Sequence, residues 1–294
     1  MKILVLGATG MAGHMISLYL KEAGHDVVGF SRKGTEFLDE NVIGDVTNFE
    51  MLKKEILSNQ YDAVINCIGI LNSDAEDHKS NAVLLNGYLP HFLSDITANT
   101  NTKIIHMSTD CVYSGSENIL FTENQLPNGP TFYDRSKALG EIINEKDLTF
   151  RNSIIGPDIS QEGIGLFNWF MKQSGSIGGY TSVLWTGVTT LTLAKAIDQA
   201  LKEDLSGLYH LVNNELISKY DLLRLFNRHF KNEELMIQKN EDVKSLKGLY
   251  NTRSDFTFSV PTYEVMVKEM YDWVIDHKDL YPYRIKMEVG KSND

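Results

Sequence analysis

The sequence predicts an α/β protein in which a doubly wound parallel sheet precedes a smaller C-terminal α/β lobe. Two observations lead to this fold class. Short apolar runs alternate with helical patterns through the first half of the chain, an order typical of parallel sheets with helices on both faces. The chain has 294 residues, enough for one large domain or two lobes at roughly 150 residues per domain. We expect a first domain over residues 1–157 and a second lobe mainly over residues 158–294, and we allow strands of residues 205–215 to return to the main sheet.

The N-terminus combines a buried strand, a glycine turn and a helix without interruption. Residues 3–6 are apolar, Gly7, Gly10 and Gly13 follow, and residues 11–23 carry apolar side chains at helical spacing. Such a turn aims backbone N–H groups and the positive end of a helix at one point, where a pyrophosphate can bind. Gly7 allows the tight turn, Gly10 lets the phosphate approach, and Gly13 lets the helix pack on the strand. Glycines also mark ordinary turns, but their position behind a buried N-terminal strand favours nucleotide binding.

The end of the second predicted strand, residues 26–30, bears on the type of dinucleotide. An acidic residue about 20 positions after the glycines binds the ribose 2′-hydroxyl of NAD, whereas a nearby Arg accommodates the 2′-phosphate of NADP. Here the strand continues into Ser31, Arg32 and Lys33, and the first carboxylate follows only at Glu36. The sequence therefore favours NADP(H) over NAD(H), with a solvated basic loop as the alternative.

Several residues fall at the ends of further predicted strands. Open parallel sheets bind ligands beyond the carboxyl ends of their strands, where Asp45, Cys67, Gly69 and Thr109 are expected. The remaining elements predicted for this domain are strands over residues 42–46, 61–66, 103–107 and 148–155, and helices over residues 48–57, 78–97 (which Pro90 can kink) and 132–144.

The chemistry is predicted to lie between Thr109 and Lys137. Tyr133 and Lys137 are four residues apart in a predicted helix, so their side chains share one face. A neighbouring ammonium favours the phenolate and would lower the pKa of a tyrosine from its reference of ~10. A phenol tuned in this way can act as a general acid or base near neutral pH. Alone, this spacing also fits a chance surface pair, but the glycine turn and Thr109 favour a catalytic site.

Together these motifs resemble the extended short-chain dehydrogenase/reductases. More narrowly, residues 108–115 (STDCVYSG) and 133–141 (YDRSKALGE) are similar to segments of dTDP-4-dehydrorhamnose reductase and its relatives. The resemblance covers most of the chain and is strongest through about residue 157. It implies a Rossmann fold and a catalytic triad of Thr109, Tyr133 and Lys137. In addition to Ser31 and Arg32, the residues expected to contact the cofactor are Gly7, Gly10, Met11, Asp45, Val46, Cys67, Ile68, Gly69, Asn86, Tyr133 and Lys137, as the resemblance implies.

The same resemblance implies a reaction, the NADPH-dependent reduction of the 4-keto group of a nucleotide-linked 6-deoxyhexulose for cell-surface polysaccharide synthesis. Tyr133 would protonate the developing alkoxide, Thr109 would hold that oxygen, and Lys137 would lower the pKa of Tyr133 and bind the nicotinamide ribose. Nucleotide-sugar 4,6-dehydratases carry Asp-Glu after the threonine, whereas this chain has Asp110 and Cys111, which disfavours dehydration. A nucleotide-sugar epimerase, or a non-catalytic NADP-binding subunit like the regulatory subunit of methionine adenosyltransferase, stays open.

Two residues depart from the family pattern beside the predicted triad. Asp134 stands where a glycine usually follows the tyrosine, and Cys111 stands where an aromatic residue is common, so either can reshape the sugar pocket. We expect Asp110 and Trp185 to contact the substrate, with Trp185 stacking from an extended lid over residues 180–187. A place for Trp185 in the core is the equal alternative. The other elements expected in the second lobe are helices over residues 190–202 and 218–230, the latter opened by a capping box of Ser218 and Asp221, a strand over residues 207–212, and a tail that frays after residue 283.

Composition narrows the class of protein. A net charge of −11 and a pI near 5.2 argue against binding to nucleic acid or to anionic membranes. Two cysteines, no signal-peptide core and no apolar stretch of roughly 18 residues predict a cytoplasmic protein without disulfides or membrane spans. The eight histidines show no metal-ligand spacing, so no metal is expected. A homodimer, common among members of the family, is possible as an assembly.

Overall fold

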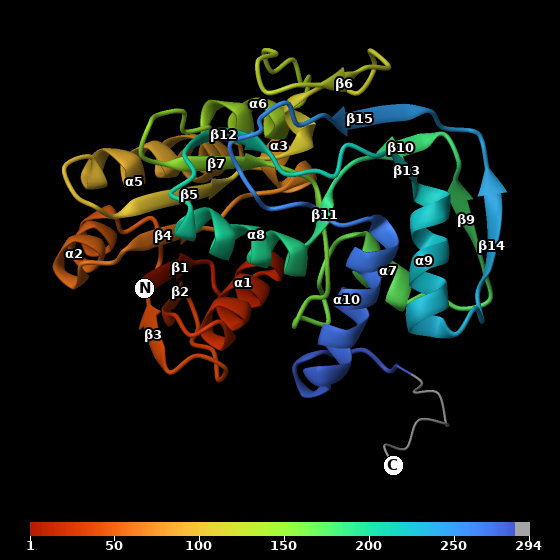
Figure 1. The fold of residues 1–294 in the computed structure, drawn as a ribbon, viewed down its shortest axis with the longest axis horizontal. Coiled ribbons are helices and arrows are strands. Elements are labelled where there is room, and N and C mark those ends of the chain that lie inside the picture. The colour runs from red at the N-terminus through yellow and green to blue at the C-terminus, as the bar shows by residue number, and fades with distance from the viewer. Residues whose placement is uncertain (286–294) are drawn as a thin grey trace.

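A computed structural model describes residues 1–285 of the chain and confirms the predicted fold class. Seven parallel strands form the main sheet in the order β12-β7-β5-β4-β1-β2-β3 (Figure 1). The strand order reverses at β1, where the chain winds first to one side and then to the other. In such sheets the crevice at this reversal is the usual place for a ligand. The strands are β1 (Lys2–Leu6), β2 (Asp26–Ser31), β3 (Glu40–Ile43), β4 (Ala63–Asn66), β5 (Lys103–Met107), β7 (Leu148–Arg151) and β12 (Gly207–His210).

Helices cover both faces of this sheet because its strands are apolar on both sides. In β1, Ile3 and Val5 belong to one buried cluster, whereas Leu4 and Leu6 belong to another, as the alternation of side chains along a strand requires. Helices α1 (Met11–Glu22) and α8 (Thr190–Lys202) pack together on the first face. Helices α2 (Phe49–Asn59) and α5 (Leu89–Thr97) pack on the second (Figure 1).

The helix predicted over residues 78–97 is not uniform. It consists of α4 (Lys79–Ala82), a π-helical turn over Val83–Tyr88, and α5. Pro90 has no N–H to donate to the carbonyl oxygen of Asn86, four residues earlier, so the regular ladder cannot close there. That oxygen instead faces Gly140, at which an added Cβ would lie only 1.9 Å away. The π-helical turn therefore places Asn86 against helix α6 (Phe132–Leu139).

Other predicted elements are also shorter than expected, and two strands among them stop where a partner strand ends. The strand predicted over residues 42–46 stops at Ile43, the partner of the last residue of β2. The strand predicted over residues 148–155 divides, because β5 ends at Met107 beside Phe150. The following residues form β8 (Ile154–Ile155) and pair with β11 (Val188–Thr189). The helix predicted over residues 132–144 is α6 (Phe132–Leu139), which Gly140 terminates.

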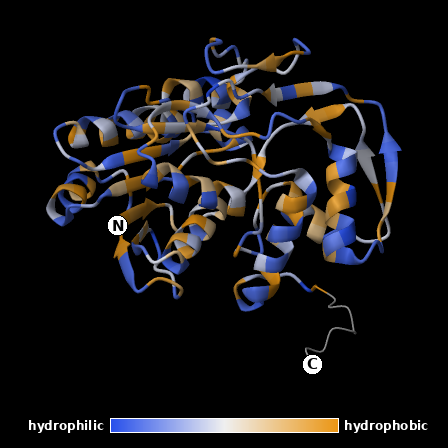
Figure 2. Ribbon diagram, in the orientation of Figure 1, coloured by the Kyte–Doolittle hydropathy of each residue, from blue (hydrophilic) through white to orange (hydrophobic). Residues whose placement is uncertain are grey.

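The second half of the chain contributes to the main sheet and also forms a smaller lobe. Strand β12 is the edge strand of the main sheet, parallel to β7. A four-stranded sheet, β13-β10-β15-β6, lies beside it, and helix α9 shows both hydrophobic and hydrophilic colours in Figure 2. The elements of this part are β6 (Leu120–Phe121), α7 (Leu166–Met171), β9 (Ser176–Tyr180), β10 (Val183–Trp185), β13 (Ile217–Ser218), α9 (Lys219–Lys231), β14 (Met236–Asn240), β15 (Ser245–Leu249) and α10 (Tyr263–Asp276).

In this half of the chain, helices α8 and α9 and strand β12 begin within one residue of their predicted starts. Helix α8 spans the residues expected for it, and Ser218 caps α9 by accepting a hydrogen bond from the Asp221 backbone. The segment expected to fray lies mostly outside the described residues. No helix within residues 1–285 has the length and apolar character needed to cross a bilayer.

Candidate active site

The glycine turn between β1 and α1 has the geometry that its sequence predicts. Gly7 adopts a positive φ of 80°, a left-handed conformation that favours glycine, and its N–H donates to the carbonyl of Phe30 at 2.8 Å. The Gly10 N–H donates back to the carbonyl of Gly7 at 2.9 Å. A Cβ on Gly13 would lie 2.0 Å from that same oxygen, so α1 packs against the turn without space for a side chain.

The positive end of α1 is open toward solvent at this turn. Gly10 occupies the N-cap position, provides no side-chain cap, and is followed by no acidic residue in the first turn. The first N–H groups of a helix have no acceptor within the helix itself. Because Gly10 is exposed, an anion can approach these donors, and the cradle fits the diphosphate of a dinucleotide.

A buried hydrogen-bond chain ties this turn to the C-terminal segment. The ring of His14 is buried, and its Nδ1 lies 3.0 Å from the Gly10 carbonyl oxygen. Burial lowers the pKa of His14, so a neutral ring donates from Nδ1 and accepts at Nε2 from the hydroxyl of Tyr281, 3.1 Å away. That hydroxyl also accepts from Nε1 of Trp273 at 3.0 Å. No local sequence signal could have predicted this contact, because 267 positions separate His14 from Tyr281.

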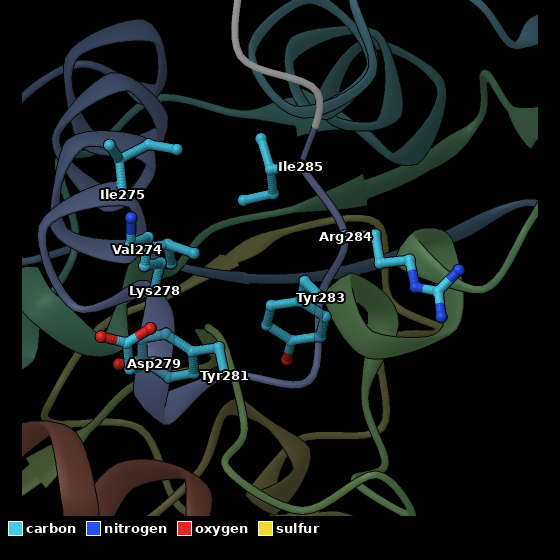
Figure 3. A pocket seen from close by; sticks show the side chains of 8 residues that line it. All are labelled: Val274, Ile275, Lys278, Asp279, Tyr281, Tyr283, Arg284 and Ile285. Atoms are coloured by element: carbon cyan, nitrogen blue, oxygen red, sulfur yellow. The ribbon is translucent and has the colours of Figure 1, made fainter.

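A pocket of about 370 Å³ lies between α10 and this C-terminal segment (Figure 3). Val274 and Ile275 of α10 line one part, and Tyr281 and Tyr283 line another. None of the residues that line it is a predicted site residue. The candidate active site lies elsewhere, at the carboxyl end of β5.

Helix α6 begins with a capping box that explains one departure from the family pattern. The side chain of Thr131 accepts from the Asp134 N–H at 3.1 Å, and the Asp134 carboxylate accepts from the Thr131 N–H at 3.2 Å. Asp134 therefore fixes the first turn of the helix that carries Tyr133 and Lys137. A glycine at this position could not form the second of these bonds.

Tyr133 and Thr109 come together as predicted, but the ionisation of Tyr133 differs from the expectation. Tyr133 is 8% exposed, and its hydroxyl lies near the side chain of Thr109, which acts to lower its pKa. Burial raises the pKa of Tyr133 above its usual value, and the acidic groups of Cys111, Asp110 and Asp134 add to this effect. The expected lowering by Lys137 is wrong in this structure. The phenol stays protonated at neutral pH and is suited to donate a proton.

Lys137 is held at the end of β5 rather than against Tyr133. Its ammonium donates to the carbonyl of Met107 at 2.6 Å. Burial lowers the pKa of Lys137 to about 8, while the charge of Glu141 acts in the opposite direction. Its Nζ also borders Gly69, since a Cβ at that glycine would lie 3.9 Å away. A lysine has three N–H donors, so the remaining ones are available to a ligand beside the segment after β4.

Asn86 positions that segment. Its Oδ1 accepts from the Ile70 N–H at 2.8 Å, and its Nδ2 donates to the Ile70 carbonyl at 2.9 Å and to the Ser136 hydroxyl at 3.0 Å. Asn86 thereby joins Cys67, Ile68 and Gly69 to α6, and burial raises the pKa of the Cys67 thiol to about 12. The contact of Asn86 with a cofactor stays a prediction.

The residues predicted near the adenosine half of a dinucleotide lie at the ends of β2 and β3. The Ser31 hydroxyl donates to the carbonyl of Lys33, whereas the Arg32 side chain is exposed. The Asp45 carboxylate accepts from the N–H of Thr47 at 2.9 Å and from its hydroxyl at 2.7 Å, which lowers the pKa of Asp45. Val46 is buried in the core. Their contacts with a cofactor stay predictions.

A second pocket, of about 300 Å³, opens at Tyr133. Cys111, Thr131 and Asp134 line it from one side, and Lys247 of β15 lines it from the C-terminal lobe. Asp110 is buried next to it and accepts from the Thr109 hydroxyl at 3.1 Å. Lys247 was not predicted, because nothing near it in the sequence indicates that β15 lies beside α6.

Trp185 does not form part of an exposed lid. It belongs to β10, is only 4% exposed, and packs against Tyr263 with a ring-centroid distance of 5.9 Å. The ammonium of Lys219 lies 4.7 Å from the centre of its ring. Because both neighbours cover the indole, the expected stacking on a substrate is corrected to a role in the core.

A buried ion pair of Arg151 and Glu141 packs beneath the end of β5, next to the site. No sequence motif pointed to it. Arg151 is 2% exposed and binds Glu141 through two hydrogen bonds of 2.6 Å. Glu141 also accepts from the Ser108 hydroxyl at 2.6 Å, next to Thr109. The pair joins β7, the residue after β5 and the end of α6. Within residues 1–285, no three His, Cys, Asp or Glu side chains are grouped to hold a metal ion.

The chain is similar to known proteins in sequence and in fold. The probable low-salt glycan biosynthesis reductase Agl14 of Haloferax volcanii is 27% identical over 228 residues, which are 74% of this chain and 76% of that protein. The dTDP-4-dehydrorhamnose reductase of Escherichia coli is 26% identical over 235 residues, 76% of this chain and 77% of that protein. The crystal structure of dTDP-4-dehydrorhamnose reductase from Bacillus anthracis in complex with NADP has a TM-score of 0.77 at 17% identity and covers 92% of this chain and 99% of that one.

The family assignment rests on the first half of the chain. Residues 1–154, which contain the glycine turn and all three residues of the predicted triad, match the protein family described as RmlD substrate binding domain. This confirms the resemblance inferred from the motifs. The chain therefore belongs to the RmlD substrate binding domain family, among the extended short-chain dehydrogenase/reductases.

Proposed function

We propose that this protein is an NADPH-dependent reductase of a nucleotide-linked 4-keto-6-deoxyhexose in the synthesis of glycan or polysaccharide sugars. The observation that carries the proposal is a protonated tyrosine, Tyr133, that lines a pocket of about 300 Å³ and lies near the side chain of Thr109. The open end of α1 lies at the carboxyl edge of the same sheet. The names of relatives in low-salt glycan and spore coat polysaccharide biosynthesis support this role.

The residues of the site divide the work of a ketone reduction. When bound, NADPH supplies the hydride. Tyr133 donates its proton to the alkoxide oxygen that forms at the sugar carbonyl, a step suited to a phenol whose pKa is raised. Thr109, next to Tyr133, holds that oxygen by a hydrogen bond. Lys137, fixed by the Met107 carbonyl, offers its remaining N–H donors to the ribose of the cofactor.

Dehydration of the sugar is less compatible with this site. The CDP-glucose 4,6-dehydratase of Salmonella typhimurium is 26% identical over 198 residues, so the two reactions must be separated by residues rather than by fold. Here Cys111 follows Asp110, and burial raises the pKa of the Cys111 thiol to about 12. A thiol that stays protonated cannot serve as the additional base that elimination needs. Ketone reduction needs no second acid–base residue.

The choice of NADPH rests on the end of β2. Arg32 extends its guanidinium from an exposed position there, where the ribose 2′-phosphate of NADP is accommodated in this fold. The solved Bacillus anthracis structure with NADP supports the same choice.

The test is NADPH oxidation with a panel of dTDP- and UDP-linked 4-keto-6-deoxyhexoses. We expect the wild-type protein to oxidise NADPH with at least one sugar, and Tyr133→Phe to reduce the rate roughly 100-fold or more. Tyr88→Phe, at an exposed tyrosine outside the pocket, serves as the matched control and keeps the rate. Tight NADPH binding without oxidation on any sugar would instead favour a non-catalytic subunit.

A further inference from the structure

Lys247 reaches the Tyr133 pocket from a distant part of the chain. It lies in β15, which pairs with β10 on one side and with β6 on the other. The Leu246 N–H donates to the Gly115 carbonyl at 3.2 Å, so β15 is also fixed to the segment that follows Thr109. Lys247 is the only cationic side chain among the residues that line this pocket.

The stem of Lys247 passes through a gap that only a glycine leaves open. Gly115 has a φ of 68°, and a Cβ built on it would lie 2.4 Å from Cγ of Lys247 and 3.4 Å from Cε. The side chain is therefore packed against the Gly115 backbone over much of its length. A lysine held in this way gives up less conformational freedom when it binds a ligand.

Among the residues that the structure describes, the ammonium of Lys247 has no carboxylate in direct contact, although burial raises the pKa of the nearby Asp110 and the charge of Lys247 acts to lower it. Within residues 1–285 it forms no hydrogen bond and has no carboxylate within 4.0 Å, whereas the two carboxylates that line the pocket each accept a backbone N–H. Glu76 accepts from the Phe132 N–H at 2.6 Å, and Asp134 accepts from the Thr131 N–H. A half-buried cation with this environment favours an anionic ligand.

We infer that Lys247 binds a phosphate oxygen of the nucleotide diphosphate of the substrate, in the pocket beside Tyr133. The inference deepens the proposed function and rests on it for the class of substrate. Cys111, the position that departs from the family pattern, lines the same pocket, so its small thiol leaves space in front of the ammonium. Lys247 is thus a specificity residue of this chain.

The experiment measures ligand binding to the NADP⁺-loaded protein by calorimetry, with no turnover required. The ligands are UDP and dTDP, which carry the diphosphate, and uridine, which has no phosphate and serves as the neutral control. Lys247→Met keeps most of the stem and removes the charge, and Lys247→Arg restores a charge. Lys244→Met, at an exposed lysine three positions earlier in the chain, makes the same change in net charge outside the pocket.

We expect Lys247→Met to weaken binding about tenfold or more, as the loss of a charge-assisted hydrogen bond implies, with partial recovery in Lys247→Arg and no change in Lys244→Met. Weaker binding of UDP and dTDP identifies the diphosphate as the group bound. An equal loss of affinity for uridine, which has no phosphate, would contradict binding to the diphosphate. Unchanged affinity for every ligand in Lys247→Met, or no binding of any ligand to the wild type, overturns the inference.

This test is independent of the reaction assigned above. A wild-type protein that binds these nucleotides through Lys247 but never oxidises NADPH would refute the reductase and leave the Lys247 site intact. A protein that reduces a sugar equally well with Lys247→Met, at unchanged KM, would support the reductase and refute the site.

Discussion

Replacing Gly10 by alanine separates a phosphate-binding turn from an ordinary structural turn. Gly10 has φ −82° and ψ 169°, a conformation open to any residue, and an added Cβ would lie no closer than 3.4 Å to another atom. Alanine is a poorer N-cap than glycine, but it also restricts the unfolded chain, and these effects oppose each other. The free energy of unfolding should therefore change by less than about 1 kcal/mol.

Cofactor binding should respond far more strongly to the same change. The methyl group of Gly10→Ala projects from the exposed face of the turn, where the phosphates must approach the free N–H groups of α1. Losing one charge-assisted hydrogen bond costs about 1.5–3 kcal/mol, which corresponds to a roughly 10- to 150-fold weaker Kd for NADPH. Fluorescence titration with NADPH gives the Kd, and urea unfolding gives the stability.

Gly13→Ala provides the contrasting variant. Its Cβ would lie 2.0 Å from the Gly7 carbonyl oxygen, so the fold itself should be destabilised. If Gly10→Ala kept wild-type affinity for NADPH, the turn would not hold the phosphates. If Gly10→Ala instead lost stability as Gly13→Ala does, the glycine would be explained by the fold alone.

Three further changes test other parts of the site. Because burial lowers the pKa of Lys137 to about 8, this residue loses its proton at lower pH than an ordinary lysine, and NADPH affinity should fall as the pH rises through about 8. A titration series in which Lys137→Met showed the same pH dependence would contradict this. Gly140→Ala places a Cβ 1.9 Å from the Asn86 carbonyl oxygen and should cost about 3 kcal/mol in urea unfolding, whereas Gly87→Ala meets only a movable leucine side chain and should cost less than about 1 kcal/mol. Equal costs would show that the π-helical turn does not depend on this close approach. Tyr281→Phe leaves two buried ring nitrogens without their shared partner and should lower stability by about 2 kcal/mol, and an unchanged unfolding curve would remove the proposed link to the glycine turn.

The parts of the fold and site that local sequence determines were predictable. Strand β5 and helix α8 have the predicted bounds, and the Gly7 turn has the expected φ, because each depends on neighbouring residues. Thr109 follows β5, and Tyr133 lies in α6, so a strand end and a helix start brought the two together. The predicted catalytic residues lie in two short motifs, residues 108–115 and 133–141, and the family could therefore be inferred from these motifs.

The remainder depends on contacts between residues far apart in the chain. The π-helical turn needs both Pro90 and the close approach of Gly140, and the ionisation of Tyr133 depends on burial that no spacing reveals. Trp185 is apolar and aromatic, and only the packing of Tyr263 decides that it belongs to the core. Lys247 enters the site through sheet pairing alone. The homodimer and the cytoplasmic location stay predictions.

Transfer of deuterium tests the central claim most directly. NADPH deuterated on the hydride-donating face of the nicotinamide C4 is incubated with the protein and a nucleotide-linked 4-keto-6-deoxyhexose, and the sugar product is examined by NMR. We expect one deuterium at C4 of a 4-hydroxy sugar and one NADP⁺ formed for each product. In Tyr133→Phe, the rate of deuterium transfer should fall roughly 100-fold or more. A product without deuterium, or conversion of the sugar with no net use of NADPH, would contradict the reductase and point to an epimerase.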